Sequence, residues 1–234
     1  MKNLNIFSLV AEYENAKSGG VLNVPNVSFI DEDSSVRYLL KNIDPYNGYE
    51  YVDLGLPSGL KWATCNIGAT SPEQAGLYFA WGETTGYTAD QCTSGVRAFT
   101  EDEYNAGPAA SISSNLSLAQ DAAHVNLGGN WRMPTKAEFE ELISNTDQTW
   151  TEDYNGTGVA GRVFTSKING NSVFFPAAGY CIYSSVGLVG SGGGYWSASW
   201  DSSSTTWCLN FGSGGQDLFN GSRYCGISVR GVCE

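Results

Sequence analysis

Residues 51–69 read YVDLGLPSGLKWATCNIGA, and this stretch indicates how the chain builds its framework. Two turn signals, Asp53–Gly55 and Pro57–Gly59, come before a run of strand-forming residues from Leu60 to Cys65. Glycine and proline are the strongest local breakers of regular structure. The stretch therefore predicts a short strand beside two tight turns.

Downstream of this stretch, one segment carries a clear helical pattern. Thr135 and Glu138 have the spacing of a capping box, in which each side chain bonds the other residue's backbone amide. Phe139 and Leu142 then fall on one face at helical spacing. The pattern predicts a helix over residues 135–145.

The next clear pattern is a hairpin. Arg162–Ile168 and Ser172–Pro176 alternate between apolar and polar residues, on either side of Asn169-Gly170-Asn171. The Asn-Gly dipeptide is the strongest short-range signal for two antiparallel strands joined by a tight turn. We expect these strands to pair.

Three further segments carry weaker signals. Ser71-Pro72-Glu73-Gln74 has the signature of a helix start and predicts a short helix before Leu77. Residues 84–116 show little periodicity and predict a long surface loop. Ser117 and Gln120 predict a short helix that carries His124.

Composition excludes several function classes. The chain has 234 residues and a formal net charge of −12, which disfavours binding to nucleic acid or to anionic membrane surfaces. No apolar run of 18 residues is present, so we expect no membrane insertion. The N-terminal apolar stretch is too short for a signal-peptide core, which predicts that the chain does not enter the secretory path.

Catalytic and metal-binding signatures are absent from the sequence. The single histidine, His124, is more typical of a packed structural residue than of a catalytic one, and no phosphate-loop, dinucleotide-binding or metalloprotease motif occurs. Six cysteines occur without a Cys-x-x-Cys pair, in a pattern more typical of free thiols than of disulfides. We therefore expect no enzyme activity, no cofactor and no metal.

Residues 181–225 have an unusual composition, with ten serines and nine glycines among interleaved aromatic residues. Antibody binding loops share this composition, because Tyr and Trp supply contact area while Ser, Gly and Asn adapt their hydrogen bonds. We assign Tyr195, Trp196 and Phe211 to the core, because they lie inside strand-like runs. The remaining aromatic residues of interest are predicted to lie on the surface: Trp200, Trp207, Phe219 and Tyr224.

An ordered series of motifs resembles a bacterial domain family named for paralogous major proteins of Fibrobacter, which is abundant in gut Bacteroides and their phages. The series runs through VDLGLPSGLKWATCNIGA (52–69), YFAWGET (78–84), GGNWRMPT (128–135), FPAAGY (175–180), GYWSAS (194–199) and SVR (228–230). The resemblance implies an α+β domain with the C-type-lectin fold over residues 49–234, containing two short helices and small twisted antiparallel sheets. Residues 1–48 carry short apolar alternations and predict a small β-rich extension.

The resemblance extends to the variable proteins of diversity-generating retroelements. In those proteins, error-prone copying at template adenines rewrites the 3′ end of the gene, and a lectin-fold face displays the altered residues. Changing the adenines of an AAC codon yields Ser, Gly, Tyr, Asp, Thr, Cys, Ile or Phe, a set in which residues 181–225 are rich. Tyr195-Trp196-Ser197 and Ser228-Val229-Arg230 would serve as the fixed frame.

The resemblance therefore implies a ligand-binding display protein for phage tropism or cell-surface attachment. The expected ligand is a protein or glycan on a cell surface, the expected location is the virion surface after cytoplasmic assembly, and a homotrimer is the expected assembly. The residues expected on the binding face are Cys181, Ile182, Tyr183, Trp200, Asp201, Ser203, Trp207, Cys208, Asp217, Phe219, Asn220, Ser222, Tyr224 and Cys225.

Two alternatives stay open on the same fold. A fixed carbohydrate-binding lectin or adhesin could stack sugars on Trp200 or Trp207, although the calcium-sugar motifs Glu-Pro-Asn and Trp-Asn-Asp are absent. An enzyme similar to the formylglycine-generating group would need two neighbouring cysteines. Cys225 and Cys233 are the only close pair in the last ten residues, and their surroundings do not match that group's pattern.

Overall fold

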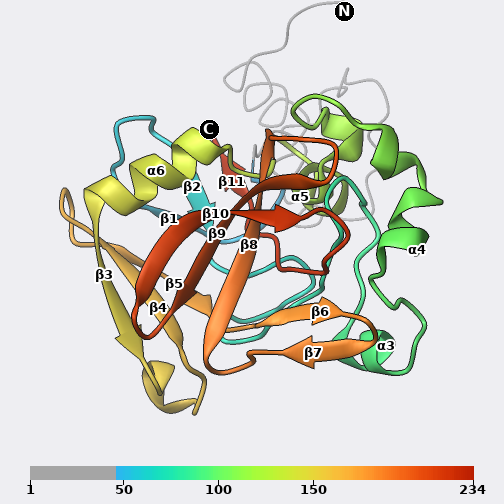
Figure 1. The fold of residues 1–234 in the computed structure, drawn as a ribbon. Coiled ribbons are helices and arrows are strands. Elements are labelled where there is room, and N and C mark those ends of the chain that lie inside the picture. Colours follow the sequence, from blue (N-terminus) through green and yellow to red (C-terminus); the bar gives the residue numbers. More distant parts are fainter. Residues whose placement is uncertain (1–45) are drawn as a thin grey trace, which may run out of the picture.

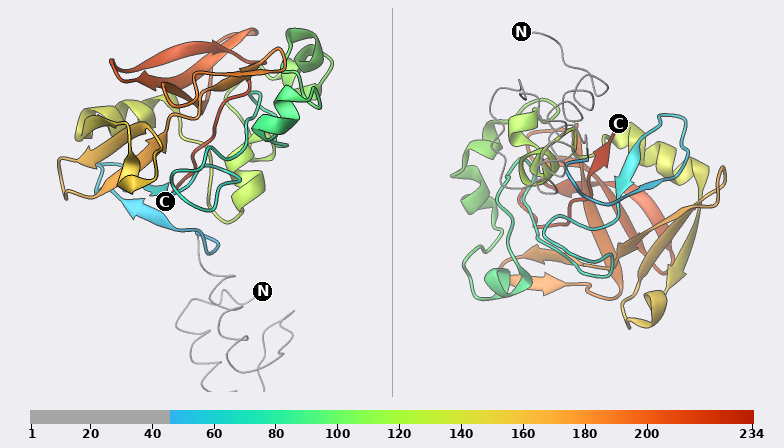
Figure 2. Two further views of the ribbon diagram at one scale, coloured as in Figure 1. Left: turned by 90° about the horizontal axis from the view of Figure 1, so that it is seen from below. Right: turned by 180° about the vertical axis from the view of Figure 1, so that it is seen from behind.

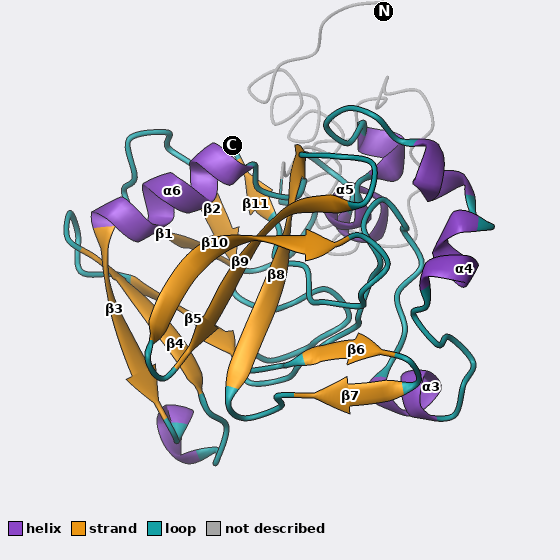
Figure 3. Cartoon of the chain, in the orientation of Figure 1, coloured by secondary structure: helices purple, strands orange, loops and turns teal. Residues whose placement is uncertain are grey.

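The computed structural model of the chain describes residues 46–234 (Figure 1). The expected β-rich extension, residues 1–48, lies almost entirely outside the described residues and stays a prediction. Within the described part, the fold is a mixed α+β arrangement of small antiparallel sheets and short helices (Figure 3). This agrees with the predicted fold class at that level.

The β-structure of the described part comprises three small sheets and one separate hairpin. The sheets have the strand orders β1-β2-β11, β10-β9-β8 and β3-β4-β5, and β6 pairs with β7. The strands are β1 (Tyr51–Asp53), β2 (Lys61–Ala63), β3 (Thr146–Thr151), β4 (Gly161–Ser166), β5 (Ser172–Pro176), β6 (Tyr180–Ile182), β7 (Ser185–Gly187), β8 (Gly192–Trp200), β9 (Thr205–Gly212), β10 (Gly215–Ser222) and β11 (Val232–Cys233). The predicted strand near residues 60–65 and the predicted Asn-Gly hairpin of β4 and β5 are confirmed.

The two ends of the described chain meet in one sheet. β11 pairs with β2, so the last residues lie beside the first strands, and Figure 2 shows the C terminus next to them. This pairing closes the domain on itself.

The helices lie on two sides of the β-structure, with α6 on one side and α3 and α4 on the other (Figure 3). They are α3 (Ala89–Thr93), α4 (Glu101–Asn105), α5 (Ala122–Leu127) and α6 (Lys136–Asn145), and the 3-10 helices are η1 (Pro108–Ser111), η2 (Leu118–Gln120) and η3 (Tyr154–Gly156). The capping box of Thr135 and Glu138 starts α6 as predicted. The described residues thus hold more short helices than the two that were expected.

The prediction of a long surface loop over residues 84–116 is wrong. It contains α3, α4 and η1, and it buries Phe99 and Tyr104. Thr88 and Thr100 cap the two α-helices through the amides of Gln91 and Glu103. These capping residues were readable in the sequence as Thr-x-x-Gln and Thr-x-x-Glu, but each helix is too short to show apolar periodicity.

The second wrong prediction is the helix at Ser71–Gln74, which does not form. Its residues make a single turn, in which the Gln74 amide donates to the Ser71 carbonyl at 3.2 Å. Gly76 follows with a φ of +73°, and a Cβ there would lie 2.4 Å from the carbonyl oxygen of Ile67. The Leu77 amide then bonds that same carbonyl. This close approach pulls the chain into an extended path before a helix can propagate.

The helix that carries His124 is present, although its cap differs from the prediction. Ser117 and Gln120 cap η2, and the Asp121 side chain caps α5 by accepting from the His124 amide. The imidazole Nδ1 lies 3.0 Å from the Trp131 carbonyl oxygen. This contact assigns His124 the structural role expected of it.

The sheet of β8, β9 and β10 separates two apolar cores. Trp196 belongs to one core, together with Phe79 and Ile227, whereas Tyr195 and Phe211 belong to the other. Neighbouring residues of a strand point to opposite faces, so a single strand supplies both cores. The predicted core positions Tyr195, Trp196 and Phe211 are therefore confirmed.

Arg230 is fully buried, and all its bonds go to neutral oxygens. Its guanidinium donates to the carbonyl oxygens of Ala63, Thr64 and Phe174 at 2.7–3.1 Å. The Nε and Nη2 groups share the amide oxygen of Asn66 at 3.0 and 2.7 Å. The guanidinium also lies 4.6 Å from the ring centroid of Phe175. Burial lowers the pKa of Arg230, and these five bonds offset the cost of removing the charge from water.

Replacing Arg230 tests whether this cluster stabilises the domain. Arg230→Met keeps the apolar stem but leaves four buried oxygen acceptors without their donor, so we expect the free energy of unfolding to fall by about 3–5 kcal/mol. Urea denaturation followed by circular dichroism measures the change. Lys167→Met is the control, because this exposed side chain makes only surface contacts, a 3.9 Å ion pair with Asp147 and a 3.2 Å bond to the Ser144 carbonyl. Its effect should stay below about 1 kcal/mol, and an equally small effect for Arg230→Met would contradict the assignment.

Candidate ligand-binding groove

A groove with a cavity volume of about 260 Å³ opens on the β8–β10 sheet, within the segment of unusual composition. It lies between β8, β10 and the β6–β7 hairpin, which Figure 1 shows beside one end of β8. Its lining residues are Gly179, Tyr180, Leu188, Gly192, Gly193, Gly194, Trp196, Cys208, Asn210, Phe219, Gly221, Ser222, Cys225 and Ile227. No charged side chain lines it.

Glycines keep the groove open. A Cβ on Gly194 would lie 3.3 Å from Ile227, and a Cβ on Gly221 would lie 3.3 Å from both Cys208 Sγ and the Trp196 ring. Backbone without side chains therefore lies directly against the apolar groups beneath it. Glycine inside a strand often marks such a place, where another backbone or a ligand approaches closely.

Phe219 is the most exposed aromatic side chain of the groove, with 58% of its surface accessible. It pairs with Cys208 across β9 and β10, and Cys208 pairs with Trp196 across β9 and β8. Cross-strand partners lie on the same face of a sheet. Phe219 thus stands on the same face as the buried Trp196, and an exposed ring of this kind is a ready apolar contact for a ligand.

Two thiols contribute apolar surface to the groove. Burial raises the pKa of Cys225 to about 11 and that of Cys208 to about 12. The Cys208 Sγ also lies 3.3 Å from the Phe219 carbonyl oxygen, to which it donates. At neutral pH both groups are protonated thiols, and neither is an activated nucleophile.

The structure divides the expected binding face between the two faces of the sheet. Phe219, Ser222 and Cys225 line the groove, and Asp217 shares the Phe219 face of β10. Close to this side, the rings of Tyr183 and Tyr224 lie 6.4 Å apart.

Most of the other expected residues do not line the groove, so the expected residues do not form one continuous binding face. Trp207 pairs with Asn220 on the opposite face of the sheet, where the Lys136 ammonium lies 3.7 Å from the centroid of the Trp207 ring. Asp201 accepts from Asn220 and Thr205 at 3.0 and 2.8 Å. Trp200 is half-buried and packs against the core that contains Trp196, and Ser203 is exposed in the β8–β9 loop. Strand alternation decided this division, because Trp207 and Cys208 are neighbours and must point in opposite directions.

Two further expected residues are core residues. Cys181 is fully buried in β6, and Cys208 is 5% accessible. Cys208 contributes only the base of the groove, and Cys181 cannot present its side chain to a ligand. Ile182, the next residue, is half-buried.

Sequence reasoning missed part of the groove. Gly192-Gly193-Gly194, Asn210 and Ile227 line it but were not among the expected residues. Three consecutive glycines directly before the strand-like run of Tyr195 and Trp196 were the available signal. The contribution of Ile227 had no local signal, because pairings with Phe79, Cys181 and Tyr195, all distant in sequence, place the segment after the sheet.

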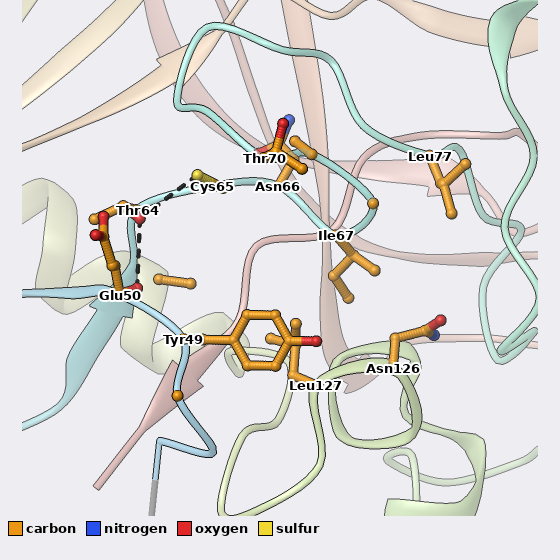
Figure 4. A pocket seen from close by; sticks show the side chains of 14 residues that line it. Tyr49, Glu50, Thr64, Cys65, Asn66, Ile67, Thr70, Leu77, Asn126 and Leu127 are labelled. Atoms are coloured by element: carbon orange, nitrogen blue, oxygen red, sulfur yellow. Dashed lines mark hydrogen bonds between the residues drawn. The ribbon is translucent and has the colours of Figure 1, made fainter. Parts of the chain in front are cut away.

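A second, larger cavity of about 510 Å³ lies away from residues 181–225 (Figure 4). Tyr49, Glu50, Thr64 and Asn66 line it together with residues of the 63–70 turn. Two of its polar side chains are engaged in the fold, since Thr64 Oγ1 donates to the Glu50 carbonyl and the Asn66 amide oxygen accepts from Arg230. The cavity borders the start of the described residues.

Residues 46–234 contain no group of three or more His, Cys, Asp or Glu side chains that could hold a metal ion. Nor does any helix in that range have the length and apolar character needed to cross a bilayer. All six cysteines fall in the range, and all are free thiols.

A scan against protein-family models, a search of curated proteins and a search of solved structures each found no match to this chain.

The thiol chemistry of the groove can be tested by alkylation. With a pKa of about 11, Cys225 is only about 0.1% thiolate at pH 8, against roughly a quarter for an unperturbed cysteine. We expect iodoacetamide to modify it about two hundredfold more slowly than the cysteine of an unstructured peptide, with the rate rising as pH approaches 11. Trypsin cleavage after Arg223 and Arg230 isolates Cys225 for mass spectrometry. A rate equal to that of the peptide cysteine would contradict the buried, protonated thiol.

Proposed function

We propose that this chain is a ligand-binding display protein whose C-terminal face is diversified by a retroelement, for phage tropism or cell-surface attachment. The C-type-lectin fold is part of the proposal. The small antiparallel sheets and the pairing of the first and last strands of the described part support it.

The observation that carries the proposal is the contact between the two framing segments. Tyr195 and Ser228 form a parallel bridge, and the Trp196 amide donates to the Ser228 carbonyl at 3.1 Å. The residues of both frames, Tyr195–Ser197 and Ser228–Arg230, are buried. The segment between them is therefore anchored at both ends by buried side chains, of which only Trp196 reaches the base of the groove.

Such anchoring is the physical requirement for a diversified face. Substitutions away from buried contacts usually change stability by less than about 0.5 kcal/mol, so a face of exposed side chains can vary while the fold persists. Phe219, Asp217 and Tyr183 are exposed in this way. A rigid scaffold with variable surface residues also gives new specificity without a new fold.

The structure offers less support for sugar stacking on the two tryptophans. Lys136 covers the ring of Trp207, and Trp200 packs against the core. A fixed lectin is therefore kept as an outcome of the test below.

Deep sequencing of this gene in a growing population of its source tests diversification. We expect substitutions confined to codons 181–225 and concentrated at adenines of the template. Codons for the buried frame, including Tyr195 and Arg230, should stay unchanged. Substitutions spread evenly, or absent, would overturn diversification and leave a fixed binder to be screened against glycans.

Two phenylalanines of one hairpin test the tolerance of the face. Phe219 is 58% accessible in β10, whereas Phe211 is 4% accessible in β9. Phe219→Ser should lower the free energy of unfolding by less than about 1 kcal/mol. Phe211→Ser, the matched control, should lower it by about 3–5 kcal/mol. Chemical denaturation of both variants measures this, and equal losses would contradict a face that tolerates change.

A further inference from the structure

The described surface offers a partner almost no free positive charge. From residue 46 onward, each lysine forms an ion pair with an acidic side chain, as do Arg97 and Arg132. The other arginines of this part, Arg162, Arg223 and Arg230, are buried. With a chain charge of −12, the field around the groove is negative, and it favours a neutral or cationic partner.

A carboxylate stands close to the mouth of the groove. Asp217 is exposed and lies two residues before Phe219 on the same face of β10, which places the two side chains roughly 7 Å apart. Asp217 Oδ1 accepts from the Leu218 amide at 2.8 Å, which restrains the carboxylate beside the groove. The groove thus combines an apolar pocket with one negative charge at its edge.

We propose that the groove receives an aromatic or large aliphatic side chain from a protein partner, and that a basic residue beside that side chain lies against Asp217. This inference rests on the proposed function and names the chemical class of its ligand. The glycine backbone of β8 and β10 supplies a flat wall on which a ring can lie, and Phe219 supplies a second contact.

The same lining disfavours a sugar. A sugar ring carries hydroxyls around its edge, and each one that is buried needs a hydrogen-bond partner. The polar side chains that line the groove are Tyr180, Asn210 and Ser222, and the remaining lining residues are apolar or glycine. An apolar side chain loses no hydrogen bond on entering this groove, so burial of its surface favours binding.

Three indoles of different charge can test the inference on the full chain. Tryptamine is cationic, indole-3-acetamide is neutral and indole-3-propionate is anionic, and methyl β-glucopyranoside serves as the sugar probe. Each is titrated while amide chemical shifts are recorded by NMR. We expect shifts at Gly192–Gly194 and Gly221 with the indoles, and affinities in the order tryptamine, acetamide, propionate. A unit charge about 7 Å away in water gives roughly a threefold step at low salt.

Variants separate the two parts of the inference. Phe219→Ala should weaken tryptamine binding roughly fivefold through loss of the ring contact. Asp217→Asn keeps an oxygen acceptor for the Leu218 amide but removes the charge, so it should abolish the difference between tryptamine and indole-3-acetamide. Ile168→Ala is the matched control, because this exposed apolar residue lies in the β4–β5 turn, away from the groove. Retained circular dichroism spectra show that each variant is folded.

Several results would overturn the inference. Groove shifts with the glucoside but not with the indoles would assign the groove to sugars. Absence of groove shifts with every probe would show that the groove is not an apolar binding site. Equal affinity for the three indoles would show that Asp217 does not favour a basic residue of the partner. None of these results bears on diversification, which the gene population tests separately.

Discussion

The buried side chain of Arg230 holds the architecture together. The Arg230 guanidinium must satisfy five N–H groups without water or a carboxylate, and it does so by binding oxygens from the β2 end, the turn after it and β5. Asn66, which accepts two of these bonds, also donates to the Tyr195 hydroxyl, and that hydroxyl donates to the Pro176 carbonyl. Segments from both ends of the described chain and β5 are thereby fixed by direct bonds to the buried charge, and β8 is joined to them through Asn66.

This network explains how a glycine-rich and serine-rich segment can hold a defined shape. Tyr195 lies at the centre of the network, and Trp196, its neighbour, donates from its indole to the Phe79 carbonyl at 2.7 Å. β8 is thus fixed on both faces, and β9 and β10 extend from it as a hairpin. Side chains that point away from these contacts, such as Phe219, are free to interact with a partner. The support and the display surface are provided by alternate residues of the same strands.

Charge placement completes the proposed binding surface. The cations of the described part are used internally, in ion pairs or in bonds to backbone oxygens, and the outer surface remains acidic. An apolar groove in such a surface selects a partner by two features at once, since a matching ring must enter and a matching charge must lie beside it. Complementary charge contributes more to partner choice and association rate than to affinity, whereas burial of the ring supplies most of the binding energy.

Local features were readable from the sequence because local bonds determine them. The α6 capping box, the Asn169–Gly170 turn and the strand positions of Tyr195, Trp196 and Phe211 each depend on residues a few positions apart. The turn at Ser71 was misread because a contact with Ile67 overrides its helix signal.

The expected binding face was misread for a related reason. Composition identifies which residues suit a binding surface, but only strand register decides that Phe219 faces the groove, that Trp207 faces Lys136 and that Cys181 is buried. Register depends on which core each face covers, and that is settled by contacts between residues far apart in the chain.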